Sequence, residues 1–192
     1  RPHHRPMTPG DQFFEEIEAG ADPAAVAEAA DRAATIIVRG ARTADQEAIG
    51  ERLLHLAETE GIETIAELWS GSPADSLAGC LWRLYLVRAW VYGAPVLAAR
   101  QYEAGRATAQ VARVIAGVAD PPGPDELRLM VDQVLGGIAG GDFADVLLRA
   151  AAFARVVAVG RAHLNSPDAA RMLTLSEQLE AAAHLELAGE LA

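Results

Sequence analysis

The sequence contains no lysine: all sixteen basic residues are arginine, and they face 27 acidic residues for a net charge of −11. An excess of negative charge repels phosphate backbones, so nucleic acid is an unfavourable partner. A P-loop also requires a lysine to contact its phosphates, and that site is excluded. The glycines of 136–141 precede Asp142, whose charge would occupy the position of a bound phosphate. We interpret these glycines as a flexible C-terminal end of the preceding helix.

Cysteine is almost absent as well, and the single residue Cys80 excludes an intramolecular disulfide and any multi-cysteine metal site. The sequence shows no targeting signal and no uninterrupted apolar run long enough for a membrane span. We therefore expect a cytoplasmic protein without a cofactor and without membrane contact. Residues 1–10 are expected to be a disordered tail or expression remnant, followed by a single domain over 11–192.

Apolar residues recur at helical spacing through most of the chain, and no useful stretch alternates with a period of two. Aromatic residues make up only 5% of the chain and alanine is abundant, which favours close packing of helices. The prediction is an all-α, single-domain helical bundle of eight or nine helices. Capping residues and prolines predict helices over 11–19, 23–39, 43–60, 62–69, 95–118 and 125–138, and a last segment from 166 with a second cap at Thr174.

Two further stretches, 72–93 and 142–160, are apolar on nearly every side and are predicted to be the two buried central helices. Ser72 is the predicted cap of the first, with Pro73 in its first turn, and Asp142 is the predicted cap of the second. Cys80 falls inside the first stretch without a neighbouring histidine to act as a base, so we expect a small core residue there rather than a nucleophile.

Arg88 and Arg149 each lie among apolar residues of a predicted central helix. A buried guanidinium requires a carboxylate or an anionic ligand, because an unpaired buried charge costs several kcal/mol. A structural ion pair with an acidic residue of the chain would satisfy each guanidinium group. An aliphatic side-chain stem that carries the guanidinium to the surface would do the same. The alternative is a small-molecule or anion-binding site that uses both arginines.

Two Glu–His pairs share a four-residue spacing, Glu51 with His55 and Glu180 with His184. This spacing places each pair on one helix face, where two carboxylates and two imidazoles could together bind a metal. Carboxylate-bridged dimetal bundles use a three-residue Glu-to-His spacing instead. Solvated pairs on acidic helix surfaces are therefore the competing interpretation.

Large apolar residues exceed what the predicted interior needs, and Trp69, Trp90, Tyr92 and Leu97 are candidates for an exposed interface. A basic strip of Arg100, Arg106 and Arg113 could instead face DNA, although a helix-turn-helix reader would need turn chemistry that is missing here. We interpret the strip as a solvated helix face.

Two runs resemble a known group of proteins: 81–85 (LWRLY) and 152–157 (AFARVV), the latter ending at Gly160 and Arg161. They are similar to core helices of a family of uncharacterised all-helical proteins from high-GC actinobacteria. The likeness covers roughly the second half of the chain, from Trp69 to His163. It implies an all-helical fold and carries over no functional residue.

Four functional hypotheses remain. The first is a non-enzymatic helical interaction or regulatory module that forms homo-oligomers or binds a protein partner. The second is a bundle that binds a small molecule or anion through Arg88 and Arg149. The third is a metal-dependent enzyme built on the Glu–His pairs, and the fourth is a DNA-associated regulator.

Overall fold

The computed structural model describes residues 23–59, 61–107, 123–138 and 142–192, which contain eight α-helices and no β-strand. The helices are α2 (Pro23–Arg39), α3 (Ala44–Thr59), α4 (Ile62–Glu67), α5 (Leu77–Gly93), α6 (Pro95–Arg106), α7 (Pro124–Gly136), α8 (Phe143–His163) and α9 (Ala169–Ala188). The all-α prediction is confirmed. The predicted tail 1–10, helix 11–19 and the second half of 95–118 lie outside the described residues.

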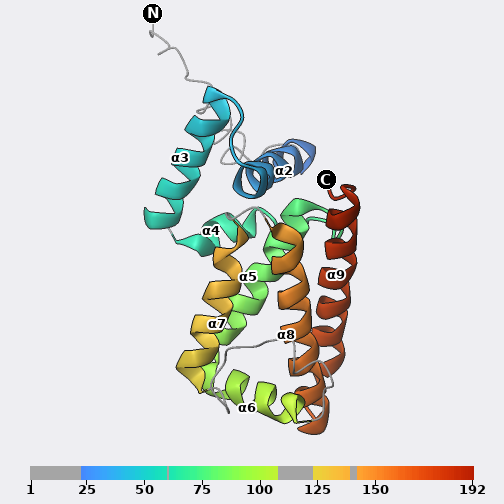
Figure 1. Ribbon diagram of the computed structural model, residues 1–192. Coiled ribbons are helices and arrows are strands. Elements are labelled where there is room, and N and C mark those ends of the chain that lie inside the picture. The colour runs from blue at the N-terminus through green and yellow to red at the C-terminus, as the bar shows by residue number, and fades with distance from the viewer. Residues whose placement is uncertain (1–22, 60, 108–122, 139–141) are drawn as a thin grey trace, which may run out of the picture.

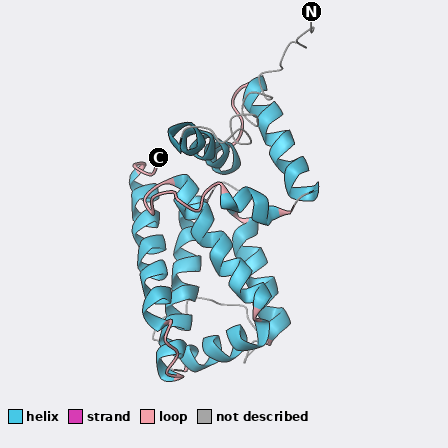
Figure 2. Ribbon diagram, turned by 180° about the vertical axis from the view of Figure 1, so that it is seen from behind, coloured by secondary structure: helices cyan, strands magenta, loops and turns pink. Residues whose placement is uncertain are grey.

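Helices α7, α5, α8 and α9 stand side by side, and α6 lies crosswise beneath them (Figure 1). The view from behind shows the same arrangement, with α2 and α3 above the bundle and short loops between most helices (Figure 2). Helix α8 runs downward and α9 returns upward beside it. Between them, the buried Ser176 hydroxyl donates a 2.8 Å hydrogen bond to the Ala151 carbonyl.

The two predicted central helices do form the middle of the bundle. Helix α8 buries thirteen of its residues and α5 buries eight. Neither helix is enclosed on every side, because Leu86 of α5 and Leu148 of α8 are each 37% exposed. Cys80 is fully buried, as predicted for a small core residue.

Local capping chemistry begins several helices where the sequence indicates. The Thr43 hydroxyl accepts from the Gln46 amide at 3.2 Å, and the Gln46 side chain accepts from the Arg42 amide at 2.7 Å. Asp142 caps α8 by accepting from the Asp145 amide at 3.0 Å. These bonds satisfy amide groups that have no partner within the helix.

Two predicted caps are wrong. The cap of α5 is Ser76, which accepts from the Gly79 amide at 3.1 Å, whereas Ser72 precedes the turns before the helix. A β-carbon at Gly79 would lie only 1.6 Å from the Pro73 carbonyl oxygen, so this turn packs tightly on the helix start. Thr174 is inside α9, and its hydroxyl donates to the Ala170 carbonyl. Hydroxyl residues make this bond within helices too, which is why the sequence pattern misleads.

The end of the described chain is anchored across the top of the bundle. Gly189 ends α9 in the left-handed conformation, at φ 71°, and turns the chain back. Leu191 is then buried in the core, and the Leu77 amide at the start of α5 donates to the Ala192 oxygen at 2.8 Å. These contacts connect the end of α9 with the start of the central helix.

Candidate functional site

A group of polar and aromatic side chains lies at the surface between α5 and α7. We name Arg88, Tyr92, Arg128 and Asp132 the α5–α7 cluster. Asp132 accepts from the Tyr92 hydroxyl and, through its other oxygen, from Arg88 Nε at 3.2 Å. A guanidinium from each helix also lies near the Tyr92 ring. The Cζ atom of Arg88 is 4.1 Å from the ring centroid, and the Cζ atom of Arg128 is 5.5 Å from it. The aromatic ring is thus fixed by two cations and one carboxylate.

The hydrogen bond to Asp132 raises the pKa of the Tyr92 hydroxyl, because ionisation would place a second negative charge beside the carboxylate. The hydroxyl is therefore a hydrogen-bond donor and a poor general base. Arg128 adds an ion pair to Asp125 at 3.1 Å. This chemistry suits recognition by arginine and tyrosine, which are common anchors of protein interfaces.

The chain turns from α5 into α6 directly after this cluster, and the turn exposes apolar surface. Val96 is 72% exposed and Leu97 is 46% exposed, at consecutive positions in the first turn of α6. Pro95 starts the helix and leaves both side chains outside, since the inward face of α6 is formed by Ala98, Gln101, Tyr102 and Gly105. The sequence alone identified Leu97 but not Val96, whose exposure follows from that inward face.

Arg88 and Arg149 each form an ion pair at the surface, which is one of the alternatives that the sequence left open for them. The Arg88 side chain is 29% exposed and pairs with Asp132, while that of Arg149 is 63% exposed and pairs with Asp145 at 2.7 Å on its own helix. The apolar neighbours in sequence are on the inward sides of α5 and α8, whereas both guanidinium groups extend outward. The two arginines therefore do not share an interior cavity.

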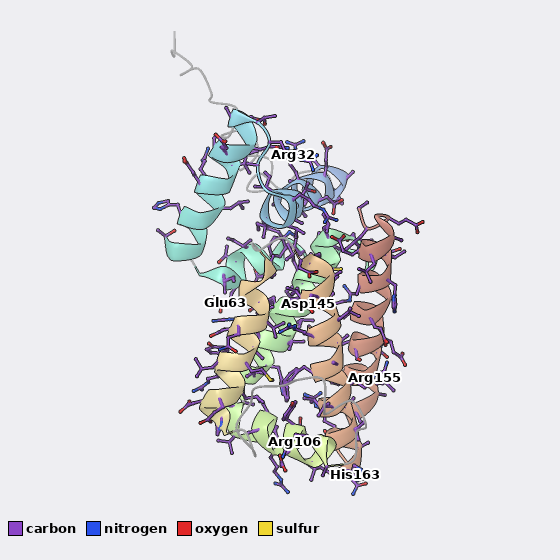
Figure 3. All side chains as sticks on the ribbon, viewed as in Figure 1. Arg32, Glu63, Arg106, Asp145, Arg155 and His163 are labelled. Carbon is purple, nitrogen blue, oxygen red and sulfur yellow. The ribbon has the colours of Figure 1, made fainter. Side chains whose placement is uncertain are left out.

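The Glu–His pairs are not brought together. Glu51 and His55 belong to α3, while Glu180 and His184 belong to α9, and these helices stand on opposite sides of the molecule (Figure 1). Glu180 is instead 2.7 Å from Arg155 of α8, which extends toward α9 (Figure 3). Within the described ranges, no three potential ligands form a group that could bind a metal ion.

Of the predicted interface residues, Trp69 is misplaced. It is only 5% exposed, and its indole nitrogen donates to the Ala30 carbonyl of α2 at 3.1 Å, so it joins the turn after α4 to α2 in the core. Trp90 is partly buried against Phe153 and has the Arg161 guanidinium 4.6 Å above its ring. Tyr92 and Leu97 are at the surface, one in the α5–α7 cluster and one beside Val96.

Among the residues that the structure describes, the buried cation is Arg161, which was not among the candidates that the sequence offered. It is 8% exposed, and its Nε donates to the Gln101 side chain of α6 at 2.8 Å. Burial lowers the pKa of its guanidinium, with a weaker opposing effect from Asp168. The sequence feature that could have drawn attention to Arg161 is its position in the last turn of α8, because cations are stabilised at helix C-termini.

No protein-family model, curated protein or solved structure matches this chain. The resemblance of the LWRLY and AFARVV runs to actinobacterial all-helical proteins therefore stays a prediction. None of the described helices has the length and apolar character required to cross a membrane.

Proposed function

We propose that the protein is a non-enzymatic helical interaction or regulatory module of the cytoplasm that associates with itself through the corner where α5, α6 and α7 meet. The observation that carries the proposal is the exposure of Val96 and Leu97, 72% and 46%, directly after the α5–α7 cluster. Burial of such side chains contributes about 1.5–3 kcal/mol each, which makes an unpartnered pair a favourable site for association.

The surrounding residues support an interface rather than a reaction centre. Tyr92 and two arginines supply aromatic area and hydrogen-bond donors, and Arg100 adds a further exposed cation on α6. The only cysteine is enclosed in the core, where burial raises the pKa of its thiol to about 12. A thiol of that kind stays protonated near neutral pH and is a poor nucleophile.

Sedimentation velocity over a concentration series from about 1 µM to about 200 µM tests the proposal. We expect the weight-average sedimentation coefficient to rise with concentration for the native chain. Val96→Glu should shift this rise to higher concentration, because it places a charge in the apolar contact. Leu187→Glu is the matched control, since Leu187 is 66% exposed at the opposite end of the bundle.

A native chain that stays monomeric over the whole range would contradict self-association. Equal weakening by the Val96 and Leu187 substitutions would show that the corner is not the interface. Unchanged far-ultraviolet circular dichroism in both variants confirms that folding is not the cause.

A further inference from the structure

The outward face of α6 carries a pattern that is complementary to itself when a second copy lies antiparallel. At about 100° per residue, Val96, Arg100, Glu103 and Ala107 fall within about 60° of one another, opposite the inward face of Ala98, Gln101, Tyr102 and Gly105. Ala107 keeps a right-handed helical conformation, so the stripe is continuous to the end of the helix. In chain order it reads apolar, positive, negative, apolar.

The structure leaves this stripe accessible. Val96, Arg100 and Ala107 are exposed, and the Glu103 side chain is 42% exposed. Figure 1 shows α6 across the lower end of the bundle, away from α2 and α3. An approaching helix would therefore meet this face without first displacing those two elements.

The two charged residues of the stripe differ in whether they have an ion-pair partner. Glu103 is 3.2 Å from Arg106 on the same helix, which Figure 3 labels at the lower end of the molecule. Arg100 has no ion-pair partner among the residues that the structure describes. In a chain with net charge −11, an exposed arginine without a partner favours an acidic group on the second surface.

We propose that two copies pair through α6, antiparallel and related by a two-fold axis. In this register Val96 meets Ala107 of the second copy and Arg100 meets Glu103, and the symmetry repeats both contacts. Leu97 and Ala104 border the stripe on one side, and a two-fold axis brings them to the same side of the pair. The result is an isologous interface, in which one surface patch contacts its own copy.

This pairing rests on the proposed function and specifies its partner and geometry. A single helix pair buries less area than a standard interface, so we expect a dissociation constant in the micromolar range, about 1–100 µM. Added salt should weaken the association, because the Arg100–Glu103 contacts lie at a solvated rim.

A charge-swap experiment tests the register by sedimentation equilibrium. Arg100→Glu places like charges opposite each other at both symmetric contacts, and Glu103→Arg does the same with the opposite sign. Each single substitution should weaken association by about tenfold. The double variant Arg100→Glu/Glu103→Arg restores opposite charges at both contacts and should recover most of the affinity.

The matched control is the swap Glu28→Arg/Arg32→Glu on α2. That pair is also exposed, with a separation of 2.9 Å on one helix, but it lies outside the proposed contact. Neither its single variants nor its double variant should change association. Thermal unfolding of each variant checks that the helices remain folded.

The outcomes separate the two proposals. If the native chain does not associate at all, both fail. If it associates but the α6 substitutions have no effect, the α6 pairing is overturned while self-association stands. If both single variants weaken association and the double variant does not recover, the two-fold register is overturned.

Cross-linking gives a second measurement of the register. Because Cys80 is buried, cysteines introduced on α6 would be the reactive ones. Mixing Arg100→Cys with Glu103→Cys should give more disulfide-linked dimer on mild oxidation than either variant alone. Equal yields in all three samples would overturn the proposed contact.

Discussion

Gly105 of α6 and Gly160 of α8 lie against each other where the two helices cross. A β-carbon on Gly105 would be 1.8 Å from the Val156 carbonyl oxygen and 2.9 Å from the Gly160 amide nitrogen. A β-carbon on Gly160 would be 1.7 Å from the Gln101 carbonyl oxygen and 2.8 Å from the Gly105 amide nitrogen. The backbones therefore approach as closely as they do only because neither residue has a side chain.

Gly105→Ala and Gly160→Ala should each destabilise the protein. Both contacts are to backbone atoms, so the helices must separate to admit a methyl group, at a cost of about 2–4 kcal/mol in the free energy of unfolding. Chemical denaturation monitored by circular dichroism measures this loss. The proposed α6 interface should weaken as well, because α6 is positioned by this crossing.

Gly136→Ala is the control for this prediction. A β-carbon at Gly136 would have no atom within 4 Å, and the residue lies at the end of α7. Alanine has the higher helix propensity, so stability should stay the same or rise by up to about 1 kcal/mol. Equal losses at Gly136 and Gly105 would contradict the account of a tight crossing.

Arg39 and Glu186 connect α2 to the end of α9, and their coupling can be measured. The two guanidinium nitrogens of Arg39 donate to the two oxygens of Glu186, and one of them also reaches the Leu191 carbonyl at 3.5 Å. This hydrogen bond to Glu186 raises the pKa of Arg39. A double-mutant cycle with Arg39→Gln and Glu186→Gln should give a coupling energy of about 1–2 kcal/mol.

The same cycle on Arg149 and Asp145 is the comparison. That pair is 2.7 Å apart on a single helix, but its side chains are 63% and 46% exposed, against 31% and 11% for Arg39 and Glu186. Solvent screening should limit its coupling to about 0.5 kcal/mol or less. A larger coupling there than between Arg39 and Glu186 would contradict the importance of the bidentate contact.

The thiol of Cys80 should make stability depend on pH above neutrality. Burial raises its pKa to about 12, with an opposing effect from Arg83. The unfolded chain loses this proton at lower pH than the folded chain does, so the stabilisation is complete below the unfolded pKa and decreases as pH rises toward 12. Between about pH 9 and pH 10.5 the contribution of Cys80 to the free energy of unfolding should fall by about 1–2 kcal/mol.

The measurement compares the native chain with Cys80→Ala at several pH values. Both proteins contain Tyr92 and Tyr102, whose pKa values are raised. The difference between the two plots of unfolding free energy against pH therefore reports the contribution of the thiol. A thiol reagent at about pH 8 should also label the native chain only after unfolding. Rapid labelling of the folded protein, or equal slopes, would contradict the burial of Cys80.

Much of the candidate site could not be obtained from the sequence. The surplus of large apolar residues made Leu97 a candidate for the surface, but it placed Trp69 there too, and the sequence left open whether Arg88 and Arg149 lie inside or reach the surface. Each helix offers a choice of faces, and only tertiary packing, such as that of α5 against α7 and of Trp69 against α2, determines which face is covered. The partnership of Tyr92 with Asp132 joins residues forty positions apart, and no local pattern predicts it.

What the sequence determined by itself was the all-α class and the starts of several helices, because both depend on contacts within a few residues. Pro23, Pro95 and the caps at Thr43 and Asp142 act on their own helix, whatever surrounds it. Only the tertiary structure decided that Arg161 is the buried cation, that Gly105 and Gly160 bring α6 onto α8, and that Val96 is left outside. Those outcomes depend on which helices meet, and the free energy of that packing is shared among residues distant in the chain.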